Sequence, residues 1–209
     1  MFTGIIQRVG AVASIDEQPF GVRLAIDPRG WSHTPTSGDS IAVDGCCLTI
    51  ADDWTPDADH LWFDAVRETL DKTSLGDRRV GDSVNLEPSL RADAMLDGHL
   101  VQGHVEGTGE VTRVQDDPED WRLFVRVPAP LMPCVVPKGS IALDGVSLTI
   151  ASVEGDTLGV ALIPTTLERT TLRDRSPGDR INVETDILAR TVVHQLRLFA
   201  PELMGRPVT

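Results

Sequence analysis

The sequence predicts an all-β protein built by tandem duplication, with two small antiparallel barrels or sandwiches followed by a C-terminal α-helix. Three observations support this fold class. Residues 38–51 read GDSIAVDGCCLTIA, and residues 138–151 repeat them as KGSIALDGVSLTIA. Short aliphatic and β-branched runs bounded by Gly, Pro or Asp occur in both halves, as is typical of strands. A longer apolar stripe at helical spacing lies near the C-terminus.

Three further pairs of segments keep the same order in both halves. They are residues 3–12 with 102–111, 69–75 with 166–172, and 81–87 with 178–184. A period of about a hundred residues corresponds to a whole domain, because solenoid and propeller repeats run to about 20 to 50 residues. We therefore expect an N-terminal domain over residues 1–97, a second domain over 98–186 and a C-terminal helix over 187–209.

Strand signals dominate each repeat, and helical periodicity is brief. The clearest strand runs are residues 22–26, 61–66, 123–127 and 158–163. Residues 68–75 and their counterpart 164–172 are expected to form one or two helical turns with threonine caps.

An Asp-Gly pair lies between two short apolar segments in each half, where glycine allows a tight turn. The strand after the first turn carries Cys47 and Thr49, and the strand after the second carries Ser147 and Thr149. Residues two apart in a strand share one face. These polar pairs are therefore either hydrogen-bonding groups of the core or the wall of a ligand site.

The segment from 187 to 204 has no partner in the first half. Its residues Leu188, Val192, Leu196 and Phe199 recur at helical spacing, which predicts an amphipathic helix that ends before Pro201. An apolar stripe on a terminal helix is typical of an oligomerisation element.

Composition excludes several classes of partner. The formal net charge of −13 repels phosphate backbones, so no nucleic acid is expected. No run approaches the ~18 apolar residues that span a membrane, and the N-terminus lacks the pattern of a signal peptide. Cys46 and Cys47 face opposite sides of one strand, and the three cysteines show neither disulfide nor zinc spacing. We expect a cytoplasmic protein with no bound metal.

Five motifs carry a family resemblance. They are MFTGII at 1–6, DGCCLT at 44–49, GHLVQGH at 98–104, DGVSLT at 144–149 and IPTTLERTTL at 163–172. Together, in this order, they resemble riboflavin synthase of the alpha-chain type across essentially the whole chain.

The resemblance implies two tandem six-stranded antiparallel Greek-key barrels per subunit and a C-terminal α-helix that helps to form a homotrimer. It also implies a reaction without a cofactor, in which two molecules of 6,7-dimethyl-8-ribityllumazine dismutate. One molecule donates a four-carbon unit to the other, which gives riboflavin and 5-amino-6-ribitylaminouracil. An association with lumazine synthase is left open.

The resemblance further implies catalytic roles for Cys47, His104, Ser147, Thr149 and Asp186. Cys47 and Ser147 stand at matched positions and would add to the C7 atom of the ring or position the water that does so. His104 belongs to the second repeat, stands where the first has isoleucine, and would remove a proton from the C7 methyl group. Asp186 would support this proton transfer. The structural alternatives are that the cysteine is a small core residue and that the histidine is a satisfied surface or core residue.

A larger set of residues is expected to bind the pteridine ring and the ribityl chain. It comprises Gly4, Ile5, Ile6, Ser40, Cys47, Leu48, Thr49, Asp64, Ala65, Val66, Arg67, Glu68, Thr69, Gly103, His104, Val105, Lys138, Ser147, Leu148, Thr149, Leu162, Ile163, Pro164, Thr165 and Thr166. One form of the family pattern has Glu or His where this chain has Thr165, so that side chain is expected in the pocket wall only. His99 is expected to structure the connection between the domains or to play a minor part in the site.

Two other function classes stay open. The first is a non-catalytic lumazine- or flavin-binding protein of the antenna type, in which the second pocket should degrade. The second is a tandem barrel that mediates protein interactions without a small ligand. The enzyme is favoured because both halves keep Cys or Ser followed by Leu-Thr.

Overall fold

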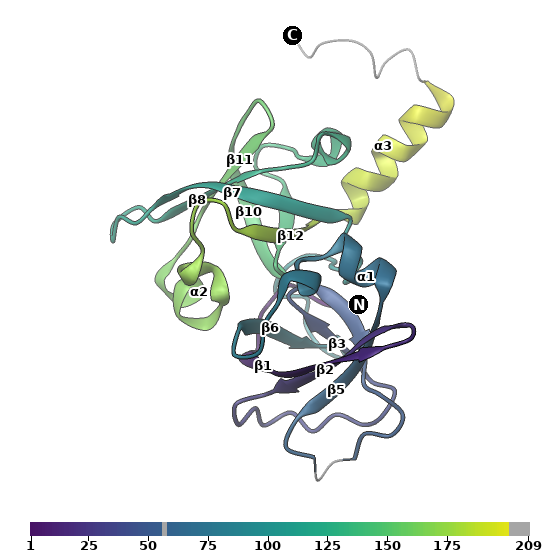
Figure 1. Cartoon of the computed structure of the whole chain (residues 1–209). Coiled ribbons are helices and arrows are strands. Elements are labelled where there is room, and N and C mark those ends of the chain that lie inside the picture. Colours follow the sequence, from purple (N-terminus) through teal and green to yellow (C-terminus); the bar gives the residue numbers. More distant parts are fainter. Residues whose placement is uncertain (56–57, 201–209) are drawn as a thin grey trace.

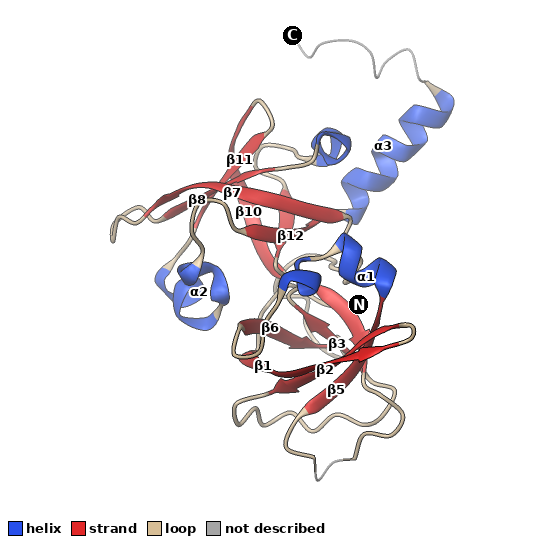
Figure 2. Ribbon diagram, in the orientation of Figure 1, coloured by secondary structure: helices blue, strands red, loops and turns tan. Residues whose placement is uncertain are grey.

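Strands make up most of the regular structure, as the aliphatic runs predict (Figures 1 and 2). The computed structural model describes residues 1–55 and 58–200. The strands of the first half are β1 Arg8–Gln18, β2 Gly21–Asp27, β3 Ser40–Val43, β4 Cys46–Thr49, β5 Leu61–Val66 and β6 Ser83–Pro88. Those of the second half are β7 Gly107–Gln115, β8 Arg122–Arg126, β9 Ser140–Leu143, β10 Val146–Glu154, β11 Thr157–Ala161 and β12 Arg180–Thr185.

Each half forms one six-stranded antiparallel sheet with the same Greek-key order. The order is β4-β3-β6-β1-β2-β5 in the first half and β10-β11-β8-β7-β12-β9 in the second. The second sheet closes into a barrel, whereas the end strands of the first meet through one bridge between Ile50 and Phe63. Each half has its own apolar core, because curling brings the aliphatic inner faces together. The predicted fold class is confirmed, with closure more complete in the second half.

The repeated Asp-Gly pairs join β3 to β4 and β9 to β10. The φ angles are 46° and 76° at Asp44 and Gly45, and 45° and 78° at Asp144 and Gly145. Two consecutive positive φ values are the mark of a type I′ turn, whose twist matches that of the strands it connects. The expected tight turns are therefore present in both halves.

These two turns also meet each other at the junction of the barrels. A Cβ atom added to Gly45 would lie 2.5 Å from the backbone nitrogen of Gly145. Glycine is thus needed at this position both for the backbone angle and for the contact between the halves.

Hydrogen bonds cross the junction in a symmetric pattern. The side-chain amide of Asn182 donates to the carbonyl of Asp44 at 2.8 Å, and that of Asn85 donates to the carbonyl of Asp144 at 2.9 Å. Both asparagines are almost fully buried. Because buried polar groups require partners, these bonds fix the orientation of one barrel on the other.

Each turn aspartate is buried and paired with an arginine. Arg78 donates to Asp44 through two nitrogens, at 2.6 and 3.1 Å, whereas Arg175 donates to Asp144 through one, at 2.5 Å. The Nε atom of Arg175 has no hydrogen-bond partner among the described residues. Burial, reinforced by the charge of Asp44, raises the pKa of Asp144 to about 6, although Arg175 opposes the shift.

Helices are short except at the C-terminal end. The matched elements are α1 Arg67–Lys72 with the 3₁₀ turn η1 Ser74–Asp77, and α2 Pro164–Arg169 with η3 Thr171–Asp174; a further 3₁₀ turn, η2 Ala129–Cys134, belongs to the second half. The hydroxyls of Thr73 and Thr170 accept hydrogen bonds from the backbone of η1 and η3. The expected helical turns with threonine caps are thus confirmed.

Helix α3, Ile187–Phe199, extends from the second barrel away from the first (Figure 1). Asp186 caps it by accepting a hydrogen bond from the backbone of Leu188. The apolar stripe is exposed, and Phe199 is 81% accessible. The predicted helix is confirmed as far as Phe199, and the part beyond residue 200 lies outside the described residues. None of the described helices has both the length and the apolarity to cross a membrane.

Candidate functional site

The opening segment of each half lies against the other half. The backbone N–H of Ser147 donates to the carbonyl of Gly4 at 2.8 Å, and that of Cys47 donates to the carbonyl of Gly103 at 2.8 Å. Ile6 is buried in the second core, and Val105 packs against the first. Each candidate site is therefore built from both repeats.

Two buried glutamates hold these crossing segments in place. Glu87 accepts hydrogen bonds from the backbone of Thr3 at 2.7 Å and of Gly4 at 2.9 Å. Glu184 accepts the equivalent bonds from residues 102–104 at 2.7, 2.9 and 3.0 Å. Burial raises the pKa of both carboxyl groups, and the backbone N–H donors oppose this shift. No role is predicted for either glutamate from the sequence, although both end the repeated pattern Asn-X-Glu.

Close approach explains the glycines of these segments. Gly4 and Gly103 have φ angles of 76° and 79°. An added Cβ would lie 2.6 Å from the Cβ of Ser147 in the first case and 2.6 Å from the Cβ of Cys47 in the second. Only glycine allows the backbone to reach the polar strand residue of the opposite half.

The first site is a pocket of about 240 Å³ at the outer face of β4, which we call the Cys47 pocket. Its lining comes from β4, the end of β5, α1 and the crossing segment of the second half. The lining residues are Cys46, Cys47, Val66, Glu68, Thr69, Lys72, Thr73, Gly103, His104 and Val105. Seven of these were expected from the sequence; Cys46, Lys72 and Thr73 were not. His104 follows the first half in the sequence, yet it contributes to the pocket of that first half.

Strand alternation separates the two adjacent cysteines. Cys46 points into the core, and burial raises the pKa of its thiol to about 12. Cys47 is half-buried on the outward face of β4, within the pocket. All three cysteines are free, as the sequence indicates. Because a thiolate is the reactive form, Cys47 is the better candidate nucleophile of the pair.

The other residues expected near this site fall into two groups. Leu48 and Ala65 are buried in the first core and support the wall from behind. Ser40 lies directly opposite Thr49 in the β3–β4 pairing, on the same outward face as Cys47. These two hydroxyls extend the polar surface beyond the pocket.

Asp64 and Arg67 are exposed beside the Cys47 pocket but do not line it. The carboxylate of Asp64 accepts two hydrogen bonds from Arg23, at 2.8 and 2.9 Å. These bonds lower the pKa of Asp64. The charge of Asp64 is thus already balanced by a neighbouring strand.

The second candidate site, the Ser147 site, lies on the outward face of β10. It consists of Ser147, Thr149, the backbone of Gly4 and the exposed side chain of Ile5. Leu148 is buried behind it, as is Ile6. The hydroxyl oxygen of Ser147 lies 2.7 Å from Nδ1 of His99, a contact that sequence reasoning missed.

Lys138 occupies a conformation that normally belongs to glycine. Its φ angle is 66°, and the matched residue of the first half is Gly38, with φ 86°. Both residues donate a backbone hydrogen bond to the strand that carries the polar face, Lys138 to Ile150 and Gly38 to Ile50. A non-glycine residue in this region costs about 1 to 3 kcal/mol, and such strain is typical of functional positions. Lys138 is exposed next to the end of the Ser147 site.

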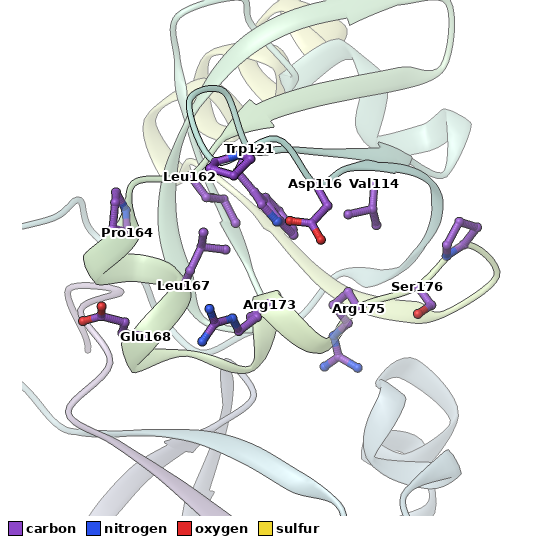
Figure 3. Close-up of a pocket in the computed structure, with 12 residues that line it drawn as sticks. Val114, Asp116, Trp121, Leu162, Pro164, Leu167, Glu168, Arg173, Arg175 and Ser176 are labelled. Carbon is purple, nitrogen blue, oxygen red and sulfur yellow. The ribbon is translucent and has the colours of Figure 1, made fainter.

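The segment 162–166 divides between two surfaces. Leu162 and Pro164 line a separate hollow of about 490 Å³, together with Trp121, Leu167 and Arg173 (Figure 3). Ile163 is 64% exposed, and Thr165 and Thr166 belong to the start of α2. The hollow of Figure 3 contains none of the repeated polar residues of β10. The Ser147 site, and not this hollow, is therefore the second candidate site.

The remaining candidate is Asp186, which caps α3. Burial lowers the pKa of His99, and the charge of Asp186 opposes this shift. Asp186 thus lies within electrostatic reach of the Ser147 site. Across residues 1–55 and 58–200, no group of three or more His, Cys, Asp or Glu side chains is arranged to hold a metal ion.

Comparison with known proteins identifies the family. A model of the lumazine binding domain matches residues 3–89 and 102–186. Riboflavin synthase of Chlamydia pneumoniae is 40% identical over 198 residues, which cover 94% of this chain and 96% of that protein. Riboflavin synthase of Escherichia coli K12 is 38% identical over 195 residues, which cover 92% and 90%.

A solved structure agrees with this result. LumP complexed with riboflavin superimposes with a TM-score of 0.79 at 25% identity, covering 88% of this chain and 99% of LumP. The two domain matches coincide with the two six-stranded units, and both include the crossing segments. The chain therefore belongs to the riboflavin synthase family of enzymes and carries two lumazine-binding domains.

Proposed function

We propose that this protein is a riboflavin synthase, which converts two molecules of 6,7-dimethyl-8-ribityllumazine into riboflavin and 5-amino-6-ribitylaminouracil without a cofactor. The observation that carries this proposal is the pair of related but unlike sites on one chain. Each offers a nucleophilic atom on an outward strand face and a crossing backbone that can hydrogen-bond the ring. Two sites for one heterocycle suit a reaction between two copies of the same molecule.

We expect the two reacting lumazines to be bound to different subunits. Helix α1, which lines the Cys47 pocket, and its counterpart α2 lie on opposite sides of the junction between the barrels (Figure 1). Lumazines bound to one chain would thus be kept apart. A second copy could bring its Ser147 site against the Cys47 pocket, and face-to-face positioning can supply about 7 to 11 kcal/mol of the barrier reduction.

Helix α3 is the element that we expect to hold such copies together. Leu188, Val192, Leu198 and Phe199 are each more than half exposed, which is an unfavourable arrangement for an isolated chain in water. A homotrimer is the assembly implied by the family resemblance. Removal of residues 187–209 should reduce the mass measured by light scattering to that of a monomer, and an unchanged trimer mass would contradict this role.

The residues divide the chemistry as follows. Cys47 or Ser147 adds to the ring carbon C7 or positions the water that does so, and His104 removes a proton from the C7 methyl group. Thr49, Thr149 and the backbone of the crossing segments bind ring donors and acceptors. Lys138 binds a ring carbonyl oxygen or a ribityl hydroxyl. We also propose that the protein acts in the cytoplasm. Whether it associates with lumazine synthase is left open.

The alternative function is a non-catalytic lumazine- or flavin-binding protein. The similarity to LumP favours it, because that protein has been solved in complex with riboflavin. The two proposals differ in turnover. Purified protein is incubated with the lumazine in the presence of a metal chelator, and flavin absorbance and fluorescence are followed. Formation of riboflavin supports the enzyme, whereas stable binding of unchanged lumazine supports the antenna-type protein.

A further inference from the structure

His99 lies in the connection between the barrels, and the backbone holds it against the Ser147 site. Its N–H donates to the carbonyl of Thr3 at 3.1 Å. A Cβ added to the preceding Gly98 would lie 2.0 Å from that same carbonyl oxygen and 3.1 Å from the Cβ of Ser147. Glycine at position 98 therefore lets the connection pass close enough for the imidazole to reach the serine.

The contact between the side chains is short. Nδ1 of His99 and Oγ of Ser147 are 2.7 Å apart, a full hydrogen bond between an imidazole and a hydroxyl. Among the described residues the first half shows no equivalent contact, and the residue matched to Ser147 there is Cys47. The contact thus distinguishes the two sites.

The surroundings keep the imidazole neutral near pH 7. Burial lowers the pKa of His99 from its ordinary value of 6.5, and the carboxylate of Asp186 opposes this shift. Among residues 1–55 and 58–200, Asp186 is the charged side chain that acts on this imidazole. On the other side, the carbonyl that holds the His99 backbone belongs to Thr3, whose own N–H is bound by Glu87.

We infer that His99 is a positioning residue of the Ser147 site, in which Nδ1 accepts the hydroxyl hydrogen of Ser147 and leaves the lone pairs of that oxygen facing the bound ring. This inference rests on the proposed function. Neutral imidazole has one nitrogen free to accept, and a serine hydroxyl has one hydrogen to give. Ser147 then acts toward the ligand as a hydrogen-bond acceptor.

Protonation of His99 reverses this bond. With both nitrogens protonated, Nδ1–H donates to Ser147, and the hydroxyl hydrogen turns toward the ligand. The Ser147 site should therefore change from acceptor to donor as the pH falls through the pKa of His99. In the Cys47 pocket, the described structure has no hydrogen bond between His104 and Cys47, so that pocket should not share this change.

The test compares full-length variants at both the His99 and the Ser147 positions. His99→Ala removes the acceptor, and His99→Asn replaces it with an amide oxygen that cannot titrate but can still accept the hydroxyl hydrogen. Ser147→Ala and the double variant His99→Ala/Ser147→Ala complete a cycle. His60→Gln, at a histidine that lines neither the Cys47 pocket nor the Ser147 site, serves as the control.

We expect His99→Ala to reduce kcat/KM about 5- to 10-fold, because one hydrogen bond is lost. In the Ser147→Ala background, the same substitution should reduce kcat/KM by less than about twofold further. His99→Asn should restore most of the rate and flatten the fall that wild type shows as the pH drops through the lowered pKa of His99. ¹⁵N NMR of the imidazole should find the tautomer with the hydrogen on Nε2, and a changed His99 pKa in Ser147→Ala.

Each outcome separates this inference from the proposed function. No turnover by wild type would overturn the proposed function, while the NMR measurement would still decide the hydrogen bond. If wild type turns over, three results would each overturn the inference alone. They are an unaltered rate in His99→Ala, additive effects on the rate in the double variant, and an imidazole tautomer with the hydrogen on Nδ1.

Discussion

The Cys47 pocket and the Ser147 site share a scaffold but differ where they would meet a ligand. Both rest on a type I′ hairpin, a glycine that crosses from the other half and a glutamate that clamps the crossing segment. However, three matched positions differ between the two sites. Cys47 corresponds to Ser147, His104 to Ile5, and Gly38 to Lys138, which has a positive φ angle. Under the proposed function, the duplicated backbone would bind the same heterocycle twice, and these side chains would give the two molecules different roles.

The largest effect should come from the side chains of the Cys47 pocket. We expect His104→Ala to lower kcat by about 100- to 10,000-fold, because it removes a proton acceptor from the reacting group. Cys47→Ala should also slow turnover much more than it weakens lumazine binding. Steady-state kinetics and an independent binding titration measure the two quantities.

Near-wild-type rates in both variants would remove these residues from the mechanism. Ile5→Ala, at the matched position of the Ser147 site, is the control for His104→Ala and should leave kcat within a few-fold of wild type. If Ile5→Ala were as damaging as His104→Ala, the two sites would not differ in the way that the comparison requires.

The second test of the difference between the two sites adds a side chain at a glycine of one crossing segment. Gly103→Ala combines a positive φ with a clash against Cys47 and Phe2, so the free energy of unfolding should fall by about 3 kcal/mol. Gly178→Ala is a matched control, because Gly178 has a φ of 96° but nothing within 4 Å of an added Cβ. Its cost should be about 1 kcal/mol. Equal losses in denaturant titrations would argue against the close approach of the crossing segment.

A smaller effect should distinguish the buried ion pairs. Burial raises the pKa of Asp144 to about 6, from an ordinary value of 3.8. Between these values the folded chain holds more protons than the unfolded chain, so the contribution of Asp144 to the free energy of unfolding falls as the pH rises. Above about pH 6 this loss is complete.

Asp144→Asn should remove that dependence. The difference in unfolding free energy between wild type and variant should change by about 1 to 3 kcal/mol between pH 4 and 6, and then stay constant. Denaturant titrations at a series of pH values measure it. A difference that is the same at every pH would show that Asp144 does not titrate in this range.

The smallest effect concerns Lys138. Lys138→Gly gives the Ser147 half the residue of the first half and relieves the left-handed strain, so stability should rise by about 1 kcal/mol. Lumazine binding at the Ser147 site should weaken at the same time. The reciprocal Gly38→Lys should cost a similar amount of stability. Unchanged binding in Lys138→Gly would leave this lysine without a role at the ligand.

Much of the fold could be predicted from the repeats, whereas the composition of each site could not. The Asp-Gly turns, the strand face of Cys47 and Thr49, and the helix after Asp186 follow from local periodicity and turn chemistry. The exchange of opening segments leaves no such local signal, because Ile6 and Val105 are aliphatic residues that suit either core. Sequence order groups His104 with the second repeat, and only the fold shows that it lines the pocket of Cys47.

Long-range polar contacts were missed for the same reason. Glu87 and Glu184 resemble ordinary strand glutamates in the sequence, and only their burial and their backbone donors reveal the clamp. From the sequence, His99 is expected either to structure the connection between the domains or to play a minor part in the site. Only the fold shows that it contacts Ser147. The repeated Asn-X-Glu was the available signal for the clamps, because both copies end a strand in the same position.

Equilibrium titration of the intact protein with riboflavin, a non-reacting product, tests most directly whether exchanged segments build two unlike sites on each chain. We predict two ligands per chain with different affinities, and loss of one class of site in Gly103→Ala while the other is retained. A single ligand per chain, or two sites that Gly103→Ala weakens equally, would contradict this account.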